Sequence, residues 1–267
     1  MLRTFIPHLF TLGNLLAGCA GLVFCLGERV VPVRLQEADA AGTEVLVTLG
    51  YSSPFYWSSF MIFLAAVLDF LDGLAARLLQ VENQLGKALD SLADGVSFGV
   101  LPGAVLYQLL MISWSKEPEA LYVPLIAGFP AFAVALAAAY RLARFNTMPA
   151  AQDFSGLPTP AMGLLVATFP LILFTNNLNL GAVVVNQWFL YGITAFLSWL
   201  MVSSVPMFSL KFAHYRWRGN ELRYGYLVAA SMLIASFAYA GIALALLGYM
   251  VINLVLYLAG RKIVKVN

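Results

Sequence analysis

Charged residues are scarce in this sequence. Asp, Glu, Lys and Arg make up only 10% of its 267 residues, whereas soluble globular domains contain roughly 25%. Hydrophobic residues make up 61%, and the net charge of +2 gives no sign of nucleic-acid binding. We therefore predict an all-α integral membrane protein.

Cysteine and histidine are also rare. Cys19 and Cys25 lie in one apolar run, without the spacing of metal ligands or of a disulfide framework, so we expect both to be packing residues. His8 and His214 stand alone near the predicted inner interface, where surface or headgroup contacts are expected. The sequence thus gives no indication of redox chemistry.

Long apolar runs dominate the chain. A membrane-spanning helix needs about 20 apolar residues, and charges, prolines and aromatic belts mark where the runs end. We predict eight spans, at about 5–26, 57–80, 87–113, 121–145, 159–175, 185–205, 223–241 and 243–260. The last two share one run from Tyr224 to Gly260, which as a single helix would be about 55 Å long. We therefore predict a tight hairpin near Gly241.

The basic residues predict the orientation of these spans. With the N-terminus in the cytoplasm, only Arg29, Arg34 and Lys116 fall in outer segments, and every other Lys or Arg falls in an inner one. This bias agrees with the positive-inside rule. Both termini are therefore predicted to be cytoplasmic.

The predicted outer loop from Gly27 to Tyr56 is the longest. Its segments VVPVRL and EVLVTL, on either side of Gly42, favour a short β-hairpin on the outer face.

One inner loop, 146–159, is rich in Gly, Pro and small polar residues, so we expect it to be irregular and to line the mouth of a site. No internal repeat is visible. We predict a single membrane domain over 1–267, with a six-helix core over about 1–210 and a C-terminal helix pair over about 223–260.

Four carboxylates lie inside this apolar chain. Asp69 and Asp72 are three residues apart in the second predicted span, and Asp90 and Asp94 are four apart in the third, so each pair shares one helix face. The two spans are antiparallel and joined near Glu82, which brings all four carboxylates to a similar depth in the cytoplasmic half of the bilayer. A charged carboxylate in hydrocarbon costs roughly 2.5 to 3.5 kcal/mol, so such a cluster predicts a function.

Four neighbouring carboxylates in a low dielectric repel one another and need protons or cations. All-oxygen ligation suits hard ions such as Mg²⁺ or Mn²⁺. We therefore expect one or two divalent cations, of the kind that stabilise phosphoryl transfer. Arg77, close by in sequence, is placed to contact a phosphate.

Together these residues form the pattern D-x-x-D-G-x-x-A-R-x8-G-x3-D-x3-D, matched by Asp69, Asp72, Gly73, Ala76, Arg77, Gly86, Asp90 and Asp94. In this pattern the sequence resembles the CDP-alcohol phosphatidyltransferases, and every position of the signature is present. The resemblance implies transfer of a phosphatidyl group from CDP-diacylglycerol to an alcohol, with release of CMP. It also implies two Mg²⁺ or Mn²⁺ ions, a homodimer among membrane lipids, and a site open to the cytoplasm in the cell's cytoplasmic membrane.

The resemblance further implies a role for each residue of the signature. The principal metal ligands would be Asp69, Asp72 and Asp90. Asp94 would take the proton of the acceptor hydroxyl and also touch metal. The contacts to CDP-diacylglycerol would be Asp72, Gly73, Ala76, Arg77 and Gly86.

Three further stretches resemble the phosphatidylserine synthase branch of that family. They are PHLFTLGNLLAG from Pro7, RLARFN from Arg141 with GLPTPAM from Gly156, and MVSSVPMFSLK from Met201. Asn14 stands where relatives that accept glycerol phosphate usually carry arginine. The branch implies L-serine as the acceptor.

A serine carboxylate needs a basic partner. Arg141 and Arg144, three residues apart at the inner end of the fourth span, offer one, and Asn14 and Asn146 would add polar contacts. The alternative for both arginines is a role as cytoplasmic anchors. His8 stands where asparagine is more usual in the family, a departure outside the signature.

Other functions remain open at this point. The same reaction could use choline, inositol phosphate or glycerol phosphate, or an archaeal ether-lipid donor. A divalent-cation transporter would also place aspartates in a membrane, but an arginine beside the ligands, Arg77, hinders a cation pathway. A purely structural or lipid-scaffolding cluster leaves the carboxylates unexplained, because only Arg77 and Lys87 lie near enough in sequence to pair with them.

Overall fold

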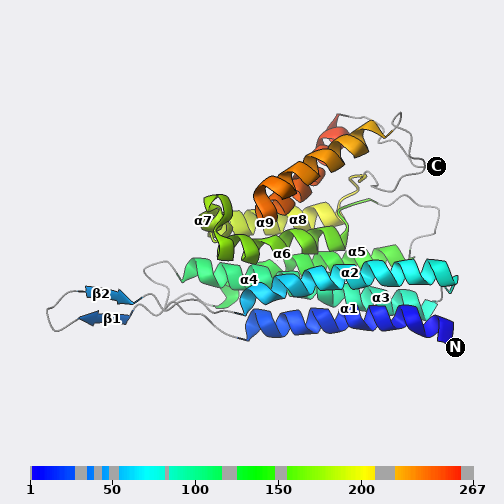
Figure 1. Ribbon diagram of the computed structural model, residues 1–267, viewed down its shortest axis with the longest axis horizontal. Coiled ribbons are helices and arrows are strands. Elements are labelled where there is room, and N and C mark those ends of the chain that lie inside the picture. The colour runs from blue at the N-terminus through cyan, green and yellow to red at the C-terminus, as the bar shows by residue number, and fades with distance from the viewer. Residues whose placement is uncertain are drawn as a thin grey trace.

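The computed structural model describes residues 2–27, 35–38, 44–47, 54–81, 84–115, 125–147, 155–207 and 220–259, so His214 lies outside it. Most helices run side by side along the long axis of the molecule (Figure 1). The helices of the bundle are α1 (Leu2–Leu26), α2 (Phe55–Leu79), α3 (Gln84–Gly95), η1 (Val96–Val100), α4 (Leu101–Trp114), η3 (Leu125–Phe132), α5 (Ala133–Thr147), α6 (Thr159–Thr175), η4 (Asn177–Asn179), α7 (Gly181–Val184), α8 (Gln187–Val202) and α9 (Glu221–Leu258).

The described helices account for all the predicted spans. Five helical segments are long and apolar enough to cross a membrane: α1, α2, the run from α3 to α4, the run from η3 to α5, and α9. The apolar helices α6 and α8 are shorter, and α9 consists of two helical arms joined at Ala238. The all-α membrane fold is therefore confirmed. The sidedness and the division into a core and a C-terminal pair stay predictions.

The helix α9 turns back on itself at Ala238, whose φ of 45° and ψ of −119° break the helix. A Cβ atom added to Gly241 would lie 2.5 Å from the carbonyl carbon of Leu233, so the two arms touch beside the turn. The predicted hairpin is confirmed, with arms 221–237 and 239–258. Its turn lies at Ala238, three residues before Gly241, and Gly241 provides the close approach between the arms.

A two-stranded β-sheet projects beyond one end of the bundle, opposite the start of α1 (Figure 1). The strands β1 (Leu35–Ala38) and β2 (Glu44–Val47) are antiparallel, with Leu35 opposite Val47. The predicted hairpin is thus confirmed. Its first strand begins at the last residue of VVPVRL, and the rest of that segment lies outside the described residues.

The π-helical segment η1 is enclosed by the surrounding helices and follows the carboxylate-bearing helix α3 directly. Phe98 of η1 is fully buried. A Cβ at Gly163 of α6 would lie 2.9 Å from the Phe98 ring, and one at Gly18 of α1 would lie 2.5 Å from Ser97 Oγ. Such close contacts on two sides fix η1, and with it the end of α3 at which Asp94 lies.

Candidate active site

Three carboxylates converge between α2 and α3. Asp69, Asp72 and Asp90 each offer an oxygen, and these oxygens all lie within 4.8 Å of one another. The helical spacing and the antiparallel course of the two helices bring them together, as the sequence predicts. Asp94 lies one turn further along α3, outside this group, but close enough for its charge to interact with Asp69 and Asp90.

The three-carboxylate cluster can hold a metal ion. Its donors are all carboxylate oxygens, which suit a hard divalent cation. The Oδ1 atom of Asp90 is buried and has no hydrogen-bond partner among the described residues. A buried acceptor of this kind needs a partner, and a cation shared with Asp69 and Asp72 would provide one.

Asp94 is almost fully buried and is held by a neighbouring helix. The amide Nδ2 of Asn14 in α1 donates a hydrogen bond of 3.0 Å to Asp94 Oδ1. Asn14 is itself fixed, because Ser97 Oγ donates a hydrogen bond of 2.9 Å to its main-chain oxygen. The Oδ1 atom of Asn14 is buried without a partner among the described residues. An unused acceptor therefore lies in the immediate surroundings of Asp94.

Asp72 receives a second contact from the same helix. The hydroxyl of Thr11 donates a hydrogen bond of 2.7 Å to Asp72 Oδ2. Reading the sequence alone did not single out Thr11. Its position three residues before Asn14, on the same face of a helix, is the signal that would have pointed to it.

The face of α2 next to Asp72 is open. A Cβ atom added to Gly73 would meet nothing within 4 Å, whereas the glycines around η1 are closely packed. Arg77 is exposed, and its Nε donates a hydrogen bond of 2.9 Å to the Gly73 carbonyl. Ala76 is half-buried on α2, and Gly86 is half-buried in the first turn of α3. The predicted contacts for a nucleotide on α2 therefore border free space.

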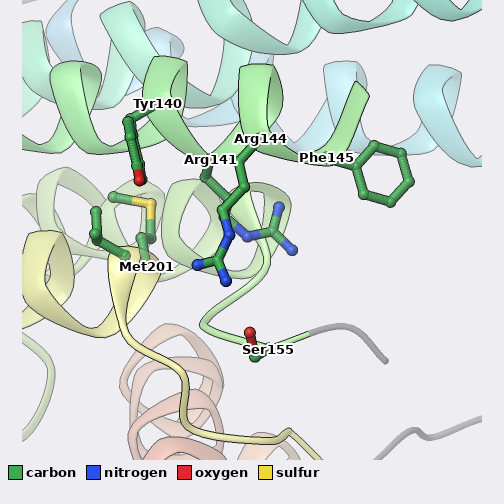
Figure 2. A pocket seen from close by; sticks show the side chains of 7 residues that line it. Tyr140, Arg141, Arg144, Phe145, Ser155 and Met201 are labelled. Atoms are coloured by element: carbon green, nitrogen blue, oxygen red, sulfur yellow. The ribbon is translucent and has the colours of Figure 1, made fainter. Parts of the chain in front are cut away.

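A basic pocket lies between the C-terminal end of α5, the segment before α6, and the end of α8. Figure 2 shows the guanidinium groups of Arg141 and Arg144 close together, with Ser155 opposite and Phe145 directed away. The residues that line it are Tyr140, Arg141, Arg144, Phe145, Ser155, Met201 and Val202. Arg141 is close enough to Asp94 for their charges to interact, and its buried Nε has no described partner. The pocket is thus electrostatically connected to the carboxylates.

The predicted acceptor residues do not all meet in this pocket. Arg141 and Arg144 line it, as does Ser155 from the inner loop that was expected at the mouth of a site. Asn14 lies at Asp94 instead. Asn146 is exposed, and its Nδ2 donates a hydrogen bond of 2.8 Å to Ser91 Oγ on α3.

Comparison with known proteins agrees with this arrangement. Residues 4–200 match the family model of CDP-alcohol phosphatidyltransferases. The chain is similar to proteins named CDP-diacylglycerol–serine O-phosphatidyltransferase. The relative from Mycobacterium leprae is 37% identical over 55% of this chain and 47% of its own length. The relative from Bacillus subtilis is 34% identical over 60% and 76%, and that from Methanocaldococcus jannaschii is 30% identical over 75% and 84%.

The chain spans about half the length of the mycobacterial relatives that it matches. The matched region contains the carboxylate cluster, Asp94 and both arginines of the basic pocket, and leaves out the α9 hairpin. With the complete signature and the model match over most of its length, the chain belongs to the CDP-alcohol phosphatidyltransferase family.

Proposed function

We propose that the protein transfers the phosphatidyl group of CDP-diacylglycerol to the hydroxyl of L-serine, giving phosphatidylserine and CMP. The observation that carries the proposal is the position of Asp94, which lies beside the three-carboxylate cluster and within electrostatic range of Arg141. A cation site, a proton acceptor and a site for the acceptor's carboxylate are thereby neighbours. The names of the relatives support serine as the acceptor.

Each of these groups has a role in the proposed reaction. Asp94 accepts the proton of the serine hydroxyl, and the hydroxyl oxygen attacks the phosphorus that carries diacylglycerol. The bond from that phosphorus to the bridging oxygen breaks, and CMP leaves with the electron pair. Mg²⁺ or Mn²⁺ bound by Asp69, Asp72 and Asp90, two ions in our proposal, would neutralise the charge of the phosphates. Gly73, Ala76, Arg77 and Gly86 would contact the CDP-diacylglycerol.

Serine would be held by its two charged groups. Arg144 and Arg141 would bind the carboxylate through charge-assisted hydrogen bonds. The unused Oδ1 of Asn14 would accept a hydrogen bond from the ammonium group. The positive-inside rule supports a site open to the cytoplasm, in the cytoplasmic membrane. The family resemblance supports a homodimer.

An assay on the purified protein tests the proposal. CDP-diacylglycerol and Mn²⁺ or Mg²⁺ are supplied with one radiolabelled acceptor at a time, and CMP and labelled lipid are measured. We expect both products with serine. Products with choline, inositol phosphate or glycerol phosphate in place of serine would overturn the choice of acceptor. No CMP with any alcohol, together with metal flux into vesicles, would overturn the enzymatic function.

A further inference from the structure

We infer that α1 is the positioning helix of the active site, with Thr11 orienting Asp72 and Asn14 orienting Asp94. The inference rests on the proposed function and adds to it two residues that act through the carboxylates. Thr11 and Asn14 are three residues apart and therefore share one face of α1. Each donates a hydrogen bond to a carboxylate on a different helix, over 2.7 Å to Asp72 and 3.0 Å to Asp94.

Both side chains are shielded from solvent. Thr11 is 3% exposed and Asn14 is 0% exposed. Each engages one oxygen of its carboxylate, Asp72 Oδ2 or Asp94 Oδ1. Because each hydrogen bond involves a single oxygen, neither donor occupies the whole carboxylate that it holds.

The two donors are uncharged, which matters for what the carboxylates do. A lysine or arginine at either position would form an ion pair and cancel the negative charge that a cation or a proton needs. A hydroxyl and an amide hold the carboxylate in one rotamer and leave its charge in place. The pair thus orients the site without neutralising it.

The helix α1 is itself held in register against the rest of the site. Ser97 Oγ donates to the main-chain oxygen of Asn14, and Gly18, one turn later, lets η1 approach so closely that a Cβ there would lie 2.5 Å from Ser97 Oγ. Asn14 and Asp94 are therefore tied to the same packed junction of α1 and η1. A positioning role requires such a fixed support.

The role of Thr11 is tested by measuring metal affinity, which does not depend on catalytic turnover. Mn²⁺ binding to the purified protein is measured by electron paramagnetic resonance for two variants. Thr11→Val keeps the shape of the side chain and removes its hydroxyl, which lies near both Asp72 Oδ2 and the Pro7 main-chain oxygen. Thr11→Ser keeps the hydroxyl. We expect Thr11→Val to weaken Mn²⁺ binding about tenfold, Thr11→Ser to bind nearly as the wild type does, and excess Mn²⁺ to restore the kcat of Thr11→Val. Unchanged Mn²⁺ affinity in Thr11→Val would overturn the role of Thr11.

The role of Asn14 is tested by measuring kcat at saturating concentrations of metal and of both substrates. We expect Asn14→Leu to lower kcat by about tenfold or more, with the KM for CDP-diacylglycerol and the Mn²⁺ affinity near those of the wild type. A rise in the KM for serine alone, with kcat unchanged, would reduce Asn14 to an acceptor contact and overturn its positioning role.

Thr168→Val is the matched control, because it makes the same substitution at an equally buried threonine, whose hydroxyl donates to the Leu165 oxygen within α6 and to no carboxylate. We expect its Mn²⁺ affinity and its kcat to stay within about twofold of the wild-type values. If Thr168→Val lowers the Mn²⁺ affinity and kcat as much as Thr11→Val and Asn14→Leu do, those losses reflect the packing of the fold, and the positioning role of α1 is overturned. If the wild type releases no CMP with any alcohol, the proposed function fails, while the Mn²⁺ measurements on Thr11 still decide its role.

Discussion

The hydroxyl of Tyr226 donates a hydrogen bond of 3.1 Å to the main-chain oxygen of Ala245, nineteen residues later in the same helical element. In a continuous α-helix these residues would be about 28 Å apart. The ring of Tyr226 also contacts that of Tyr249, with centroids 5.8 Å apart. The two arms of α9 are therefore joined by polar and aromatic contacts between spans that lie outside the matched family region.

The hairpin makes a prediction about two glycines of α9. A Cβ at Gly241 would collide with the Leu233 carbonyl, whereas one at Gly248 would meet nothing within 4 Å. We expect Gly241→Ala to destabilise the protein by about 1 to 3 kcal/mol through overpacking. Gly248→Ala should be neutral or stabilise by up to about 1 kcal/mol through helix propensity. Thermal unfolding in detergent measures both, and equal melting temperatures would contradict the hairpin contact.

The proton acceptor is tested by Asp94→Asn. Asparagine keeps an oxygen that can accept the hydrogen bond from Asn14, so the fold and the binding of CDP-diacylglycerol should be retained. The loss of a general base typically costs about 10²- to 10⁴-fold in rate, and we expect kcat to fall within that range. Release of CMP gives kcat, and a separate binding measurement with CDP-diacylglycerol provides the control. A normal kcat would exclude Asp94 as the base.

The metal cluster predicts a dependence of activity on divalent cations. Chelation with EDTA should abolish CMP release, and Mn²⁺ or Mg²⁺ should restore it. Asp90→Asn removes one charge from the cluster, so we expect about a tenfold or greater increase in the Mn²⁺ concentration needed for half-maximal activity. Glu221→Gln on α9 removes the same charge outside the cluster and should leave that concentration unchanged. An Asp90→Asn enzyme with normal Mn²⁺ dependence would refute the assignment of this ligand.

Local patterns predicted the spans and the carboxylate cluster well, because both depend on regular helix geometry. Apolar runs of about 20 residues mark spans, and spacings of three and four residues place Asp69 with Asp72 and Asp90 with Asp94. The same helix geometry explains why Asn146 does not line the basic pocket. It follows Arg144 by two residues, about 200° around the helix, and so faces α3 rather than the pocket.

Features that depend on contacts between distant segments were not predictable in the same way. The spacing of Thr11 from Asn14 places both on one helix face, but the carboxylate that Thr11 contacts is defined only by the packing of α1 against Asp72. The π-helical segment η1 lies where α1 packs against Ser97 and α6 packs against Phe98. The turn at Ala238 uses a positive φ. Sequence rules assign such a conformation to glycine, so the sequence alone points to Gly241 rather than to Ala238.

Two arginine substitutions test the acceptor pocket, because each should change the KM for a different substrate. Arg144 lines the basic pocket, so Arg144→Ala should raise the KM for serine about tenfold or more, the value of a lost charge-assisted hydrogen bond, and leave the KM for CDP-diacylglycerol unchanged. Arg144→Lys should be intermediate, because lysine keeps the charge but loses the bidentate geometry. Arg77, on the open face of α2, serves as the matched control. Arg77→Ala should raise the KM for CDP-diacylglycerol and spare that for serine. An unchanged KM for serine in Arg144→Ala would remove Arg144 from the pocket and leave it as an anchor at the membrane surface.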